Sequence, residues 1–87
     1  MSDLTYNDFK RPEYDDVVQQ AAIQMEKLQA LYTAGRLTDA QYQELGRNIL
    51  TLQSSNLSLL EMQRREHIME AMKLIAKIAG IIVPLFL

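Results

Sequence analysis

The stretch "LQALYTAGRLTDAQYQEL", residues 28–45, decides the fold, because it ends one helix and begins another within a few residues. Gly35 predicts the end of the first helix, since glycine enters the left-handed conformation of a helix C-terminus without steric cost. Thr38 and Gln41 have the spacing of a capping box, which predicts the start of the second helix. So short a link between two amphipathic helices predicts an antiparallel helical hairpin.

The residues on both sides of this turn have the apolar spacing of helices that pack lengthwise. Apolar side chains recur in steps of three and four, as on one face of a helix. Pro12 predicts the start of the first helix, because the first helical position accepts proline. We therefore expect a hairpin over residues 12–53, preceded by an extended N-terminal arm over residues 1–11. The side chains expected to close the hairpin are Tyr14, Val18, Met25, Leu28, Tyr32, Tyr42, Leu45 and Ile49.

Residues 25–50 resemble the helix-turn-helix module of the short C-terminal domain (SHOCT) family. The matching positions are Leu28, Leu31, Tyr32, Gly35, Leu37, Thr38, Tyr42 and Leu50. Gly46 and Arg47 depart from the family, which usually has charged residues there, and this hairpin is followed by a further long segment. The resemblance implies an oligomerising or membrane-adjacent accessory module, with no catalytic residues.

Composition and motifs argue against a catalytic or nucleic-acid-binding domain. The chain has 87 residues, no cysteine and a net charge of −2, so it has neither a disulfide framework nor a global positive field. His67 is the only histidine, and we interpret it as a solvated side chain in a charged segment. The sequence contains no glycine-rich phosphate loop and no nucleophile with a plausible set of partners. We therefore expect a protein that is not an enzyme, with no cofactor, metal, small-molecule substrate or nucleic-acid partner.

The last segment, residues 54–87, is expected to form a C-terminal helix with an apolar docking tail. One long helix from about residue 39 to about residue 79 is favoured, because no proline or glycine forces a break between the hairpin and the tail. A break at residues 54–58, where serine and asparagine compete for backbone hydrogen bonds, is the alternative. The overall fold is thus predicted to be all-α, a helical hairpin followed by a long or broken helix.

Charges on the C-terminal helix fall on one narrow stripe. Glu66, Glu70, Lys73 and Lys77 are separated by steps of four, three and four, and most other directions are apolar. A helix that is apolar around most of its circumference is buried in a protein assembly or in lipid. Copies of the chain could join their apolar seams and leave the stripe outward or paired between neighbours. The residues expected to dock or to meet a membrane are Ile68, Met72, Lys73, Ile75, Lys77, Ile82 and Phe86.

These features predict a self-associating structural or assembly protein, a small helical subunit of a multi-copy complex that docks through its C-terminal helix. Small domains without disulfides often obtain burial from a partner subunit. A small phage virion component is the specific case that the size and helix content suggest. The alternative is a membrane-anchored or membrane-active protein using residues 68–87, and a third reading is a helical adaptor or chaperone. The N-terminus is no secretory signal, so we expect cytoplasmic synthesis, followed by association with a virion or a membrane.

Overall fold

The structure of the protein, a computed structural model, describes residues 4–54 and 61–82. In chain order these residues form a short 3₁₀ helix, η1 (Tyr6–Phe9), and three α-helices, α1 (Asp16–Thr33), α2 (Asp39–Ser54) and α3 (Met62–Ala79). Every regular element within these two ranges is helical, so the all-α prediction is confirmed.

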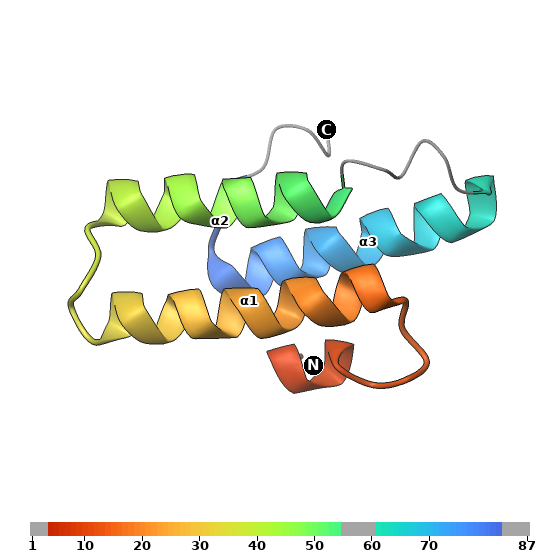
Figure 1. Ribbon diagram of the computed structural model, residues 1–87, viewed down its shortest axis with the longest axis horizontal. Coiled ribbons are helices and arrows are strands. Elements are labelled where there is room, and N and C mark those ends of the chain that lie inside the picture. Colours follow the sequence, from red (N-terminus) through yellow and green to blue (C-terminus); the bar gives the residue numbers. More distant parts are fainter. Residues whose placement is uncertain (1–3, 55–60, 83–87) are drawn as a thin grey trace.

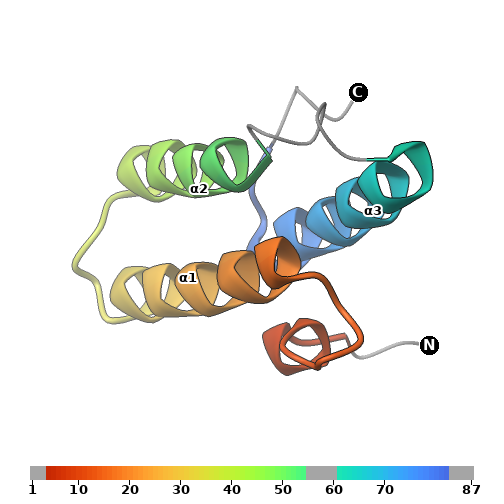
Figure 2. The ribbon, with the colours of Figure 1, turned by 45° about the vertical axis from the view of Figure 1, so that its right-hand side comes forward.

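The three α-helices enclose one core. Helices α1 and α2 lie side by side and run in opposite directions, and α3 packs against both of them (Figures 1 and 2). The element η1 covers α1 and α3 from the other side. The larger side chains that are fully buried come from all four elements, and they are Phe9, Val18, Met25, Leu50, Ile68, Met72 and Ile75.

The turn between α1 and α2 has the expected geometry. Gly35 adopts a φ of +79°, in the left-handed region that glycine enters most easily. The amide of Thr38 donates a hydrogen bond of 2.9 Å to Oε1 of Gln41, and the amide of Gln41 donates one of 3.1 Å to Oγ1 of Thr38. This reciprocal pair is the predicted capping box, which is confirmed.

The N-terminal segment differs from the extended arm expected over residues 1–11. Residues Tyr6–Phe9 form η1, and the aromatic rings at both its ends are buried. Helix α1 begins at Asp16 rather than near Pro12, because the Asp15 side chain accepts a hydrogen bond from the amide of Val17 and caps the helix. The segment before Asp15 is thus free to turn and to bring η1 against the core.

The favoured single helix from residue 39 to residue 79 is wrong. Helix α2 ends at Ser54, and α3 begins at Met62 after Glu61, whose φ of −57° and ψ of 149° are not helical. A straight continuation of α2 would carry the last helix away from α1, whereas two separate helices allow α3 to bury its apolar side against the hairpin. The alternative break at residues 54–58 falls mostly outside the described residues.

The buried face of α2 is rotated from the one expected. Leu45 was expected to close the hairpin, but it is 41% exposed, while Tyr42, Gly46 and Leu50 are buried. A Cβ atom on Gly46 would lie 2.8 Å from Cγ1 of Ile81 and 3.4 Å from Cε of Met25. Glycine at position 46 therefore lets the segment after α3 approach α2 closely.

The hairpin residues expected on α1 and just before it face inward. Val18, Met25 and Leu28 are buried in the core, and Tyr14 and Tyr32 are partly buried against it. Ile49 of α2 is also partly buried against the core. The ring of Tyr32 stacks on that of Tyr42, with centroids 4.3 Å apart, so the two helices touch at the turn end as well.

Candidate functional site

The apolar side of α3 belongs to the core of the single chain. Ile68, Met72 and Ile75, all expected to dock with a partner, are 0% exposed. They pack in one cluster with the buried side chains of α1 and α2. The expectation is corrected for these three residues: a two-helix hairpin leaves one side of its apolar faces uncovered, and α3 covers it.

Polar contacts hold the C-terminal end of α3 against the start of α2. The hydroxyl of Tyr42 donates a hydrogen bond of 2.5 Å to the carbonyl oxygen of Ala79. The side-chain amide of Gln43 donates one of 2.6 Å to the carbonyl oxygen of Gly80, and its Oε1 accepts one of 3.1 Å from the amide of Ile82. Helix α3 ends at Ala79, and Gly80 follows it with a φ of +74°, so these contacts satisfy backbone groups at and beyond the end of the helix.

Gln43 is a residue that sequence reasoning missed. Its partners lie 37 and 39 residues away along the chain, and no local pattern signals a contact over that distance. Burial raises the pKa of the neighbouring Tyr42, so its phenol stays protonated and remains a donor at neutral pH.

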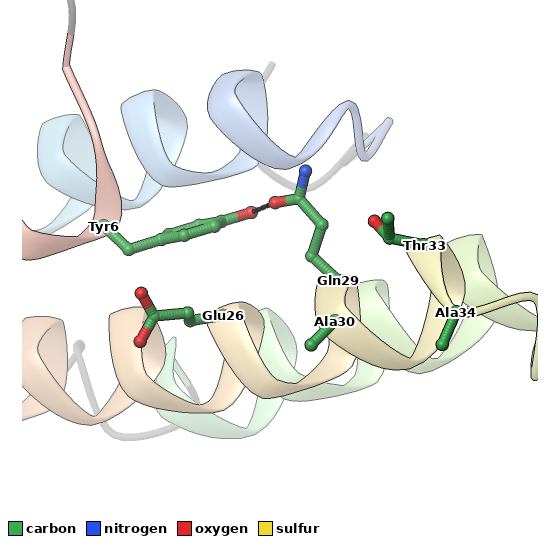
Figure 3. A pocket seen from close by; sticks show the side chains of 6 residues that line it. All are labelled: Tyr6, Glu26, Gln29, Ala30, Thr33 and Ala34. Carbon is green, nitrogen blue, oxygen red and sulfur yellow. Dashed lines mark hydrogen bonds between the residues drawn. The ribbon is translucent and has the colours of Figure 1, made fainter.

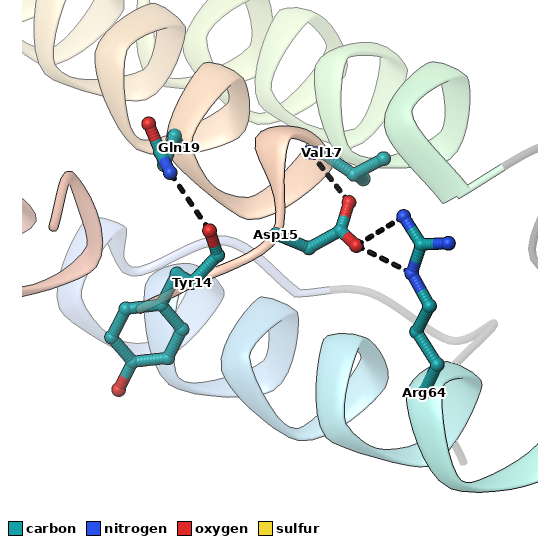
Figure 4. Close-up of polar contacts among 5 residues, drawn as sticks. All are labelled: Tyr14, Asp15, Val17, Gln19 and Arg64. Atoms are coloured by element: carbon teal, nitrogen blue, oxygen red, sulfur yellow. Dashed lines mark hydrogen bonds and ion pairs between the residues drawn. The ribbon is translucent and has the colours of Figure 1, made fainter. Parts of the chain in front are cut away.

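An ion pair joins the opposite end of α3 to the start of α1. Nε and an Nη atom of Arg64 each lie 2.5 Å from one oxygen of the Asp15 carboxylate, while the other oxygen accepts from the amide of Val17 (Figure 4). Nε2 of Gln19 donates to the carbonyl oxygen of Tyr14 at 2.7 Å on the same turn. Both ends of α3 are thus attached to the hairpin, which fixes which side of the helix faces outward.

The side of α3 that faces away from the core, called here the outer face of α3, consists of Glu66, Glu70, Lys73, Leu74 and Lys77. All five side chains are exposed, and Leu74 is an apolar side chain that remains 39% exposed among charges. Three shallow hollows of about 80, 240 and 280 Å³ meet at Leu74. Two of them lie under Leu4 and beside Tyr14, so the N-terminal segment forms their far walls.

His67 lies at the margin of the outer face of α3. Its exposed imidazole stacks on the ring of Tyr14, with centroids 5.7 Å apart and planes inclined by 14°. Within residues 4–54 and 61–82, no group of three histidine, cysteine or acidic side chains could hold a metal ion. The stacked rings join α3 to the residue that precedes the N-cap of α1.

A larger hollow of about 460 Å³ lies between η1 and the C-terminal half of α1. The phenol of Tyr6 covers one side of this hollow, and side chains of α1 and the residue after it line the other side (Figure 3). These are Glu26, Gln29, Ala30, Thr33 and Ala34. The phenol donates a hydrogen bond of 2.5 Å to Oε1 of Gln29, and the carboxylate of Glu26 pairs with Lys10. Burial raises the pKa of Tyr6, which keeps the phenol neutral. Tyr6 and Gln29 are thus paired with each other across this hollow, and Glu26 is paired with Lys10.

The remaining residues expected at the C-terminus are only partly described. Ile82 is 71% exposed, and Lys73 and Lys77 extend from the outer face of α3 into solvent. Phe86 lies outside the described residues, as does the rest of the predicted docking tail beyond Ile82. In the described part of the chain, no helix combines the length and the apolar character that a membrane crossing requires.

Comparison with known proteins finds no family model, curated protein or solved structure that matches the chain. The resemblance of residues 25–50 to the SHOCT module therefore stays a prediction.

Proposed function

We propose that the chain is a non-enzymatic structural or assembly protein, a small helical subunit that associates with copies of itself in a larger complex. The observation that carries this proposal is the outer face of α3, where exposed Leu74 lies at the meeting point of three hollows and is surrounded by charged side chains. The sequence predicted docking through the apolar side of α3, which is buried in the core. We now propose docking through the outer face of α3 instead.

The chemistry of this face suits a protein partner. A contiguous apolar patch rimmed by polar groups is typical of a surface that binds another protein, and here Leu74 lines one hollow together with Leu4 and Ile78, beside Lys77. An anionic lipid surface would attract Lys73 and Lys77, but it would repel Glu66 and Glu70 on the same stripe. A protein surface that offers both signs of charge and an apolar contact for Leu74 complements all five residues.

Sedimentation equilibrium of the purified chain over a wide range of concentration tests the proposal. We expect a mass above that of the monomer that increases with concentration. Leu74→Ser should weaken this association, because it removes the apolar contact from the outer face of α3. Leu31→Ser is the matched control, since Leu31 is 45% exposed on α1 and lies outside that face. A wild-type chain that keeps the monomer mass at every concentration would contradict the proposal.

A further inference from the structure

We infer that the partner of the outer face of α3 is the same face of a second copy of the chain, packed antiparallel across a twofold axis. The axis passes midway between Glu70 and Lys73. This inference rests on the proposed function, because it identifies the surface through which the chain would self-associate.

The order of the charges carries the inference. Along α3 the stripe has two acids followed by two bases, and the spacing of Glu66, Glu70, Lys73 and Lys77 is the same from either end. When a second copy runs in the opposite direction, each acid therefore meets a base at the same height along the axis. Glu66 faces Lys77 of the other copy, and Glu70 faces Lys73 of the other copy. By symmetry the arrangement forms four such pairs.

Within one chain each of the two blocks of like charge is unfavourable, and an attraction arises only where the blocks meet, between Glu70 and Lys73. Glu66 and Glu70 are like charges four residues apart on one helix, as are Lys73 and Lys77, and such pairs repel each other. The ion pairs among the described residues are Lys10–Glu26, Arg11–Asp8 and Arg64–Asp15, so none of them uses the stripe. The two blocks of like charge are thus exposed in the single chain, and a reversed copy supplies the opposite charge for both.

The position of Leu74 agrees with this axis. It lies two and a half residues from the midpoint of the stripe, which is about 4 Å along a helix that rises 1.5 Å per residue. The twofold axis is perpendicular to the plane that contains the two helix axes, so both copies of Leu74 lie on the same side of that plane. The two side chains then lie within reach of each other, and each covers apolar surface that the single chain leaves exposed.

Charge reversal tests the pairing. Variant E66K/E70K carries only bases on the stripe, and variant K73E/K77E carries only acids. Each alone should bind itself at least about tenfold more weakly than the wild type at low salt, because every facing pair becomes repulsive. An equimolar mixture of the two variants should associate again, and so should the fourfold variant with both blocks exchanged. All four positions are exposed, so circular dichroism should show unchanged helicity.

Single cysteines test the direction of packing, since the chain contains no other cysteine. Leu74→Cys lies near the proposed axis, and its two copies would be about 8 Å apart along the helices, so a short bismaleimide cross-linker rather than a direct disulfide should join them. Met62→Cys is even more exposed, since Met62 is 64% exposed and Leu74 39%, but it lies about 14 Å from the midpoint, so its two copies would be about 28 Å apart. Met62→Cys should therefore stay monomeric on a denaturing gel, whereas parallel packing would link it.

The outcomes separate the inference from the proposed function. If the wild type associates and both reversal variants associate equally well, the proposed function stands and this interface is wrong. Efficient linking through Met62→Cys also overturns the antiparallel arrangement. A wild type that never associates overturns both proposals.

Discussion

Replacing Ile75 by alanine tests whether α3 belongs to the fold of a single chain. Ile75 is 0% exposed, and shortening a fully buried aliphatic side chain to alanine costs about 2–5 kcal/mol. A domain of 87 residues has a total stability of about 4–13 kcal/mol, so the loss is a large share of it. Because 1 kcal/mol shifts the melting temperature of so small a domain by about 4–8 °C, we expect a decrease of at least about 8 °C.

The same substitution at Ile82 is the matched control. Ile82 is 71% exposed, so Ile82→Ala should change the free energy of unfolding by no more than about 0.5 kcal/mol. Thermal and urea unfolding of both variants is followed by circular dichroism at two protein concentrations. The difference between the variants should not depend on concentration, because the contacts of Ile75 lie within one chain. If Ile75→Ala unfolds like Ile82→Ala and loses only self-association, the buried side of α3 belongs to an interface between chains and the reasoning is refuted.

Three further predictions concern the contacts that join α3 to the hairpin. Gly46→Leu should destabilise the fold by about 1–3 kcal/mol despite its better helix propensity, and adding Ile81→Ala should recover part of that loss in urea unfolding. Burial raises the pKa of Tyr42 above its usual value of 10.0, so the folded state holds this proton more tightly than the unfolded state. Its contribution to stability is then present below pH 10.0 and is lost as the pH rises through the raised pKa, and Tyr42→Phe should show a shallower alkaline decline of melting temperature. Asp15→Ala should cost about 1 kcal/mol through the lost helix cap. Asp15→Asn keeps a capping oxygen and loses the ion pair, so its loss in free energy of unfolding should equal that of Arg64→Ala, which loses only the ion pair. Equal losses in free energy for Asp15→Ala and Asp15→Asn would contradict this division between the cap and the ion pair.

The hairpin could be predicted because its signals are local. Gly35, Thr38 and Gln41 act through backbone groups within a few residues of themselves, and these contacts form as the sequence indicates. The face of α2 could not be predicted in the same way. Counting apolar side chains favoured Leu45, whereas the contact with the core is made through Gly46, which has no side chain to count. Its close approach to Ile81 depends on a segment 35 residues further along the chain.

The sequence also left open what the apolar side of the C-terminal helix packs against, for a related reason. The apolar spacing of Ile68, Met72 and Ile75 states that this side is buried, and it does not state whether the cover comes from the same chain. The contacts that decide the matter are long-range ones, from Tyr42 and Gln43 to the end of α3. The candidate site could be predicted only as a stripe of charges, since nothing in the sequence distinguishes Leu74, which stays exposed, from the apolar residues of α3 that are buried.

The division of α3 into a buried side and an outer face changes what the charged stripe means. While the apolar side was expected to meet a partner, the charged stripe was expected either to face outward or to be paired between neighbouring copies. With Ile75 inside the chain, the outer face of α3 is the side of this helix that remains accessible. There the order of charges matters, because the residues of each block repel one another within the helix, and a surface with the opposite order neutralises both blocks. A reversed copy of α3 has that order, whereas a parallel copy would set acid against acid and base against base.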